Sequence, residues 1–382
     1  MYKLHMDPNT AKYIFDHQDF QGKFLRGKVS FPPENENGVN LMTDVHKTFL
    51  QDEEYIKMQG LVAHDLKKEN QTVSMRLQNK QCDFINNVSL IISNHDTRTL
   101  NQMVKSIKFT GGTQEIDSIT KGHVSTIENV IKMKSKLLGL NSEVQYHTRC
   151  IFVPLVLSPF LESQLLSMDL YYHDLEIIVE FEPGIDIPKM DIVAQKYFMK
   201  QGRNTIVIDN DCLISESPIA FSRPVSMLCP QTLFYEKSEK ITGDQIRISC
   251  PMKFPTSVLM LWSAAFDDVV DIEISLDEHV LYHGTVESLQ AYTHAILNMR
   301  NKQDCNEKNP LCFFMCDPKT IPDAGISSNQ ILPNLSTAND TNIVLKMKEG
   351  SCQVNDIFTI DIATLSYNCI NFINNMCGMA FA

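Results

Sequence analysis

The sequence predicts an all-β protein made of two tandem antiparallel β-sandwiches with short inserted helices and long loops. Three observations support this fold class. Apolar and polar residues alternate along many short segments, helical patterns are few, and the order of the expected elements repeats once along the chain. Because helices do not alternate with every strand, a doubly wound α/β sheet is disfavoured.

Alternating strands are expected in both halves of the chain. In residues 175–181, apolar side chains point to one face and glutamates to the other. The same period of two is present in four further segments, namely residues 245–249, 271–277, 343–348 and 358–362. In the last of these, Asp361 is expected on the more exposed face. Each strand should have one buried and one wetter face, as antiparallel sheets do.

Buried strands and two helices complete the expected elements. Continuous apolar runs predict strands buried on both faces, at residues 150–157, 258–262 and 311–315. The first helix begins near Ser125, which forms a capping box with Glu128, and Gly139 is a natural stop. The second helix lies in residues 285–297, where apolar residues recur at helical spacing.

The order of these elements is repeated, which indicates two domains of similar architecture. In each half an alternating strand ends at a turn, a helix-containing connection follows, and then come a buried strand and another alternating strand. These strands fall at residues 107–112, 150–157 and 175–181 in the first half, and at 272–284, 311–317 and 343–348 in the second. Prolines cluster in residues 215–230, where the halves join. We expect an N-terminal domain with an N-terminal arm at residues 1–215, and a C-terminal domain at residues 216–382.

Composition narrows the class of protein. Of the 382 residues, 43% are hydrophobic and 21% are charged, as in ordinary globular proteins. A net charge of −12, from 34 Lys and Arg against 46 Asp and Glu, disfavours a protein that coats nucleic acid. We expect no direct sequence-specific binding of nucleic acid. The apolar stretches are about half as long as a bilayer span, so no transmembrane helix is expected. The first residues lack the apolar core of a secretion signal.

Cysteine usage indicates a reducing compartment. The eleven cysteines are odd in number and scattered rather than spaced as a framework. We expect reduced, mostly buried thiols with no obligatory disulfide. Four Asn-x-Ser/Thr sequons are expected to be unused, at Asn70, Asn87, Asn334 and Asn339.

No catalytic, cofactor or metal site is predicted, because each candidate group has a simpler structural interpretation. Gly111 and Gly112 lack the Lys-Ser/Thr of a phosphate loop and fit a tight turn. His147 and Cys150 lie beside an apolar strand without an orienting carboxylate, which disfavours a nucleophile pair. Three cysteines lack the CxxC spacing and the nearby His of a zinc site, namely Cys305, Cys312 and Cys316.

Charged groups also have structural interpretations. His173 and Asp174 are neighbours on a strand, so their side chains should point to opposite faces rather than form an acid–base pair. The acidic residues in 267–278 are expected to form a solvated surface rather than a calcium site. Four lysines predict a small basic patch that suits rim salt bridges, at Lys121, Lys132, Lys134 and Lys136.

Five segments carry motifs of a known family in the family's order. Residues 107–117 read IKFTGGTQEID, and residues 152–155 (FVPL) are followed by residues 168–177 (MDLYYHDLEI). Further motifs lie in residues 250–262, 310–329 and 367–381. Together they resemble the double jelly-roll major capsid proteins of nucleocytoplasmic large DNA viruses and their smaller virophage- and transposon-type relatives.

The resemblance implies two eight-stranded antiparallel jelly rolls and a structural role without enzymatic activity or cofactor. It implies a homotrimer that forms a pseudo-hexagonal capsomer of an icosahedral shell. The implied partners are further copies of the chain, minor capsid or penton proteins and an inner viral membrane. The implied location is the virion, assembled in the host cytoplasm or nucleus. Residues 120–145 and 285–307 are expected at trimer seams and in an outer tower, because such long connections usually carry function.

Two alternatives remain open from sequence. One is a transient double jelly-roll scaffold on a viral membrane. The other is a β-sandwich carbohydrate-binding or hydrolytic protein, which would need an aromatic or carboxylate-lined groove. The single Trp262 lies in a strand of the buried type and offers no such platform.

Overall fold

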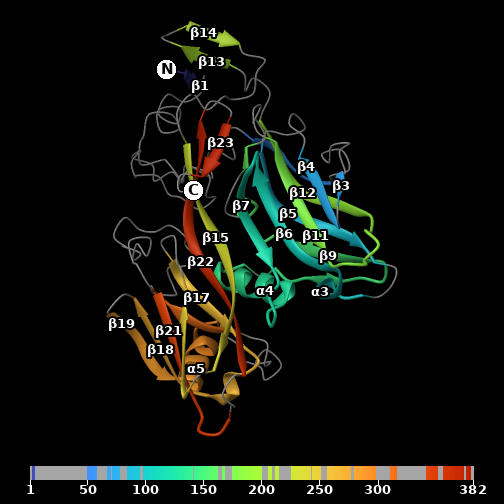
Figure 1. The fold of residues 1–382 in the computed structure, drawn as a ribbon. Coiled ribbons are helices and arrows are strands. Elements are labelled where there is room, and N and C mark those ends of the chain that lie inside the picture. The colour runs from blue at the N-terminus through green and yellow to red at the C-terminus, as the bar shows by residue number, and fades with distance from the viewer. Residues whose placement is uncertain are drawn as a thin grey trace. The chain divides into compact units, whose positions relative to one another are not determined.

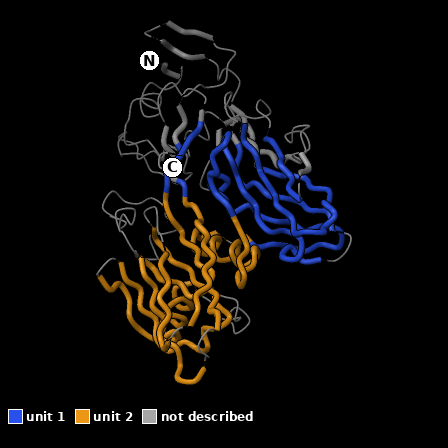
Figure 2. Tube along the Cα trace, in the orientation of Figure 1, with its two compact units in different colours: residues 1–118, 143–229, 368–382 blue, residues 119–142, 230–367 orange. Residues whose placement is uncertain are grey.

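The computed structural model of the protein is dominated by antiparallel strands (Figure 1). It describes residues 2–4, 50–57, 67–69, 71–77, 84–94, 98–140, 142–161, 166–167, 174–199, 205–208, 211–214, 225–241, 243–250, 256–276, 279–297, 310–315, 341–351, 356–373 and 376–379. The chain forms two compact units (Figure 2). Unit 1 comprises residues 1–118, 143–229 and 368–382, and unit 2 comprises residues 119–142 and 230–367. The expected boundary between residues 215 and 216 lies outside the described residues.

Unit 1 is built mainly from two sheets. The first has the order β2-β12-β5-β9-β8, with β10 paired to β5. Its strands are β2 (Leu50–Lys57), β5 (Phe84–Ser93), β8 (Gln145–Tyr146), β9 (Cys150–Pro154), β10 (Leu166–Ser167) and β12 (Met190–Met199). The second has the order β3-β4-β11-β6-β7. Its strands are β3 (Lys67–Glu69), β4 (Thr72–Leu77), β6 (Val104–Gly111), β7 (Gln114–Thr120) and β11 (Leu175–Phe181).

Smaller elements accompany these sheets. A short helix, α3 (Leu100–Met103), precedes β6. A separate three-stranded antiparallel sheet has the order β1-β13-β14. Its strands are β1 (Tyr2–Leu4), β13 (Thr205–Ile208) and β14 (Asp211–Ile214).

Unit 2 also contains two sheets. One has the order β15-β22-β17-β20, with β23 paired to β22. Its strands are β15 (Val225–Lys240), β17 (Thr256–Trp262), β20 (Leu311–Phe314), β22 (Ile357–Ile373) and β23 (Met376–Met379). Three parts of this sheet belong to unit 1, namely residues 225–229 of β15, residues 368–373 of β22 and all of β23. The other has the order β16-β21-β18-β19, from strands β16 (Gln245–Ser249), β18 (Val269–Leu276), β19 (His279–Thr285) and β21 (Thr341–Met347). The helices of unit 2 are α4 (Ile127–Leu137), α5 (Val286–Ile296) and a 3₁₀ turn, η3 (Phe266–Asp268).

The repeat expected from element order is present in the sheet topology. The order β4-β11-β6-β7 in unit 1 corresponds to β16-β21-β18-β19 in unit 2, and β2-β12-β5-β9 corresponds to β15-β22-β17-β20. In both halves a helix follows the last strand of one sheet, α4 after β7 and α5 after β19. The chain then enters the other sheet, through β8 and β9 in the first half and through β20 in the second. Each half therefore contains two sets of four strands in the same order, which confirms the all-β prediction.

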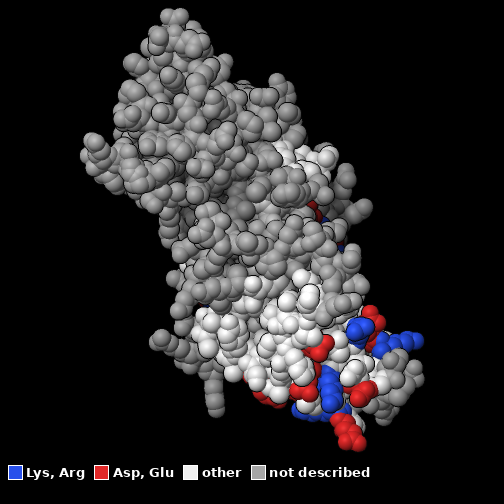
Figure 3. Space-filling model, turned by 90° about the vertical axis from the view of Figure 1, so that its left-hand side faces the viewer, with Lys and Arg blue, Asp and Glu red and all other residues white. Residues whose placement is uncertain are grey.

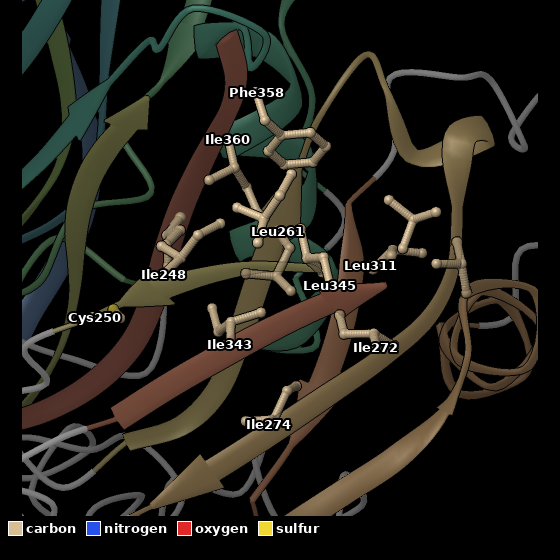
Figure 4. Close-up of a cluster of buried hydrophobic side chains, with 14 of the residues drawn as sticks. Ile248, Cys250, Leu261, Ile272, Ile274, Leu311, Ile343, Leu345, Phe358 and Ile360 are labelled. Atoms are coloured by element: carbon tan, nitrogen blue, oxygen red, sulfur yellow. The ribbon is translucent and has the colours of Figure 1, made fainter. Parts of the chain in front are cut away.

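Period-two alternation builds the core of unit 2. Apolar residues of β18 and β21 face apolar residues of β17 and β22 (Figure 4). The side chains that meet there include Ile272 and Ile274, Ile343 and Leu345, Leu261 and Ile360, each fully buried. Their alternate neighbours are more exposed in β16, β18 and β21. The alternating pattern thus predicts the strands of this core correctly.

Burial on both faces is correct for β17, where all seven residues are buried. In the other two apolar runs, Phe152 of β9 and Phe313 of β20 remain half-buried. The prediction for Asp361 in β22 is wrong, because its side chain is 0% exposed. Its carboxylate is held by backbone N–H groups, as described below, and so it does not need water.

The helix predictions are correct in position and wrong in one cap. Helix α4 begins after Thr126, whose hydroxyl accepts a hydrogen bond from the Asn129 N–H at 3.2 Å. Ser125, the predicted cap, instead donates its own N–H to Asp361 at 2.7 Å. Helix α5 begins after Thr285, within the predicted range.

Candidate functional site

The Gly111–Gly112 segment forms a tight turn, as predicted. Strand β6 ends at Gly111, and β7 begins at Gln114. Gly112 has a φ of +62°, a left-handed conformation that glycine adopts without strain. Its N–H donates to the Asp174 carbonyl at 2.8 Å. The two glycines therefore connect adjacent strands.

The other candidate groups are placed separately. The N–H of His147 donates to the carbonyl of Cys150 at 2.9 Å, in the hairpin between β8 and β9. Asp174 forms an ion pair with Arg76, whereas His173 lies outside the described residues. Cys312 is fully buried in β20, and Cys305 and Cys316 lie outside the described residues. Within the part of the chain that the structure describes, no three His, Cys, Asp or Glu side chains are grouped to hold a metal ion.

The predicted basic patch is wrong at its centre. Lys134 is 0% exposed and lies among the buried residues of α4, whereas Lys132 and Lys136 are half-buried. A lysine stem has enough apolar length to pack within a helix interface, which charge spacing alone does not reveal. The acidic segment is only partly exposed: Asp267 is exposed, whereas Asp271 and Glu273 are half-buried. Residues 277 and 278 lie outside the described residues.

None of the helices in the described ranges is long and apolar enough to cross a membrane.

The outer face of one unit 1 sheet is covered by paired charges. The Lys105 amine donates to the Glu180 carboxylate at 2.7 Å, and this bond holds the pKa of Glu180 below its ordinary value. Lys108 and Glu115 form another ion pair at 3.0 Å. Such exposed pairs contribute little to stability, but they make the face polar. Figure 3 shows charges of both signs interspersed at the lower right of the described surface.

Three exposed large apolar side chains lie in strand β19 and helix α5. Val280 and Leu281 of β19 are 56% and 41% exposed, and Tyr292 of α5 is 46% exposed. Strand β19 is the edge strand of its sheet within the described residues. An edge strand with exposed apolar residues can pair with or pack against another chain. We call Val280, Leu281 and Tyr292 the apolar edge.

One buried hydroxyl links helix α5 to strand β20. The Thr293 hydroxyl accepts the Cys312 N–H at 2.9 Å and donates to the Leu289 carbonyl at 2.8 Å. Thr293 is 0% exposed, so water does not compete for these bonds. The hydroxyl joins the helical connection directly to strand β20.

Replacing Thr293 by Val is expected to lower the free energy of unfolding by about 1–3 kcal/mol, because the Cys312 N–H loses its acceptor in a buried site. Thr293→Ser keeps the hydroxyl and should lose less. Urea unfolding of both variants measures the difference. A loss in Thr293→Val no larger than the loss in Thr293→Ser would contradict the role assigned to the hydroxyl.

The comparisons with known proteins give structural matches only. No protein-family model and no curated protein sequence matches the chain. The PBCV-1 protein VP54, in a crystal structure fitted into a reconstruction of the virophage Sputnik, aligns with a TM-score of 0.57 and 13% identity. The alignment covers 87% of this chain and 97% of VP54, and a structure of the PBCV-1 virus capsid gives the same values. The chain has the double jelly-roll fold of viral capsid proteins.

A second virus shows the same double jelly roll. The Faustovirus major capsid protein aligns with a TM-score of 0.50 and 8% identity over 83% of this chain and 90% of that protein. The eight corresponding strands in each half, four in each sheet, are the strands of the two jelly rolls. At such low identity the fold is kept by alternation of apolar residues rather than by particular side chains.

The described thiols of the double jelly roll form no disulfide. They are Cys150, Cys229, Cys250, Cys312 and Cys377. Burial raises the pKa of Cys250 to about 12 and that of Cys377 to about 11, from an ordinary value of 9.0. The thiols of Cys250 and Cys377 are therefore protonated and unreactive in the folded protein at neutral pH.

Alkaline pH is expected to destabilise the protein through these thiols. Because the folded-state pKa values lie above the ordinary value, the stability contribution is complete below about pH 9 and falls as pH rises toward 11–12. Urea midpoints measured from pH 8 to pH 11 should decrease over that window. Iodoacetamide should label Cys250 and Cys377 slowly in native protein and fully in urea. Stoichiometric cross-links in non-reducing mass spectrometry would contradict the prediction of no obligatory disulfide.

Proposed function

We propose that this chain is a viral major capsid protein whose homotrimer forms a pseudo-hexagonal capsomer of an icosahedral shell. The observation that supports it most is the double jelly roll, which extends over most of the chain and of the two capsid structures compared above. The motifs that resemble large DNA virus capsid proteins point in the same direction. The proposed role is mechanical and involves neither enzymatic activity nor a cofactor.

The architecture suits a shell. Two jelly rolls of the same strand order give a trimer six similar barrels, which can occupy a hexagonal position. Closed symmetry then multiplies individually modest contacts between capsomers. In each half, sheets of few strands leave short edges, which limits uncontrolled strand pairing.

We propose that the long helical connections between strands form the contacts between copies of the chain. We assign the helical connections in residues 120–145 and 285–307 to trimer seams and the outer tower. Tyr292 of the apolar edge lies in the second of these regions, and Val280 and Leu281 lie in β19 just before it. We propose that the apolar edge is buried against another copy of the chain. Residues 298–309 lie outside the described residues. The proposed chain boundary between the jelly rolls remains between residues 215 and 216.

Other partners follow from the proposed role. A closed shell needs minor or penton proteins at its vertices and seams, and an inner membrane is a further contact. The expected location is the virion. Presence of the protein in purified mature particles distinguishes the capsid role from a transient scaffold, which would be absent from them.

The purified protein is expected to be a trimer. Size-exclusion chromatography with light scattering should give three times 43.5 kDa at micromolar concentration. Replacing Val280 and Leu281 by Lys should weaken the self-association if the apolar edge is at the seam, whereas Glu115→Lys on the charged face of unit 1 serves as the control. A stable monomer of the unmodified chain at this concentration would contradict the trimer.

A further inference from the structure

Each compact unit contains a segment from the opposite half of the chain. Residues 119–142, which follow β7 of the N-terminal half, belong to unit 2, and residues 368–382, at the C-terminus, belong to unit 1. We infer that these two segments are reciprocal latches that make the folding of the two halves interdependent. The N-terminal jelly roll is then completed only after the last residues of the chain have been synthesised.

The first latch is a buried carboxylate bound by a loop. Asp361 of β22 accepts three backbone N–H groups, from His123 at 3.1 Å and from Val124 and Ser125 at 2.7 Å each. Its side chain is 0% exposed. The Asp361 carboxylate also lies against Gly122, where a Cβ would approach its Oδ1 to 2.6 Å. Only glycine leaves room for the carboxylate at this position.

This contact fixes the segment that carries α4. A carboxylate removed from water is costly unless its hydrogen bonds are replaced, and the loop supplies three of them. The loop in turn leads directly into α4, whose apolar face is buried. Asp361 therefore acts as a positioning residue that holds a segment of the N-terminal half in unit 2.

The second latch is the C-terminal strand β23 against the β6–β7 turn. The Gln114 side chain accepts the Met379 N–H at 3.0 Å, and Cys377 is 4% exposed. A Cβ on Gly111 would lie 2.7 Å from the Cys377 sulfur and 3.0 Å from Ile116. Glycine at position 111 is thus required by a residue far along the chain, and the C-terminus completes unit 1.

The inference rests on the proposed function only for its biological use. If the chain is a capsid protein, the latches prevent a truncated chain from presenting a finished N-terminal jelly roll to the shell. The coupling between segments is itself a property of one chain. It is tested without reference to trimers or capsids.

Double-mutant cycles on the full chain test both latches. Gly111→Ala should lower Tm by about 5 °C or more, and Cys377→Ala should restore part of this loss by removing the sulfur that the new Cβ meets. Gly122→Ala should be equally harmful in the native background and nearly neutral in Asp361→Ala, where no carboxylate opposes it. Gly243→Ala is the matched control, because nothing lies within 4 Å of its Cβ position.

Hydrogen exchange locates the effect. Asp361→Ala should accelerate exchange of the α4 amides at least tenfold, and Gln114→Ala should do so for β23, while β4 and β18 keep their protection. Additive effects in both cycles, or unchanged exchange in α4 and β23, would overturn the inference. Failure of the chain to trimerise would contradict the proposed function and leave these readouts unaffected.

Discussion

A chain that lacks residues 372–382 is expected to be insoluble or unassembled. The deletion removes β23 and the end of β22, which pair from Ile370↔Met379 to Ile373↔Met376. Cys377 is buried, at 4% exposed, against Gly111 of unit 1. The deletion therefore also exposes the surface of unit 1 that Cys377 covers. Each large apolar side chain lost from such a site costs about 1.5–3 kcal/mol. Typical stabilities are about 5–15 kcal/mol, so the loss is a large share of the total.

Soluble yield, light scattering and thermal unfolding measure this effect. Deletion of residues 1–9 is the control and should be tolerated, since β1 is a three-residue edge strand of a separate sheet. The side chain of Phe372 and all of Phe381 lie outside the described residues. We expect both side chains to be buried, because an exposed tail of such apolar composition would aggregate. Soluble trimers of the C-terminal deletion with an unchanged Tm would refute the placement of this segment in a core.

Leu261→Ala is expected to lower the free energy of unfolding by about 2–5 kcal/mol. Leu261 is 0% exposed at the centre of the unit 2 core, between Ile360 and the facing sheet (Figure 4). The substitution removes apolar contacts and leaves a cavity that a close-packed sandwich only partly closes.

Two further variants make the Leu261 result specific. Leu261→Met conserves volume and should cost less than about 1.5 kcal/mol. Ile357→Ala, at an exposed position outside the apolar edge, should have an effect within about 0.5 kcal/mol on unfolding. Urea unfolding gives all three values. A Leu261→Ala variant as stable as the native protein would place the core elsewhere.

The strands were predictable from sequence because their cause is local. Alternation in β11, β16, β18 and β21 reflects one face on the core and one nearer to water, and each of these strands is where the pattern predicts it. The order of elements was predictable for the same reason. Helices α4 and α5 lie where an apolar face recurs at helical spacing between two strand patterns, whereas the four-residue helix α3 was not predicted.

Asp361, Ser125 and Lys134 were not predictable because their environment comes from distant parts of the chain. Asp361 reads as a solvent-facing residue of an alternating strand, yet the N–H groups that bind it come from residues 236–238 positions earlier. The same contact uses Ser125 and moves the helix cap to Thr126. A glycine next to a helix start, Gly122, was the sole local sign of this close approach.

The candidate site was less predictable than the fold. The tight turn at Gly111–Gly112 was predicted correctly, but the sequence offered no reason for the first glycine beyond the turn. The structure shows that Cys377, at the other end of the chain, needs that space. The apolar edge was missed because Val280 and Leu281 belong to a short strand whose exposure depends on its edge position in the sheet.

Negative-stain electron microscopy of the purified full-length chain tests the capsid proposal most directly. The account predicts uniform particles with a pseudo-hexagonal outline, produced by three copies of two similar jelly rolls. Averages that show single two-lobed molecules, or assemblies without threefold symmetry, would contradict it.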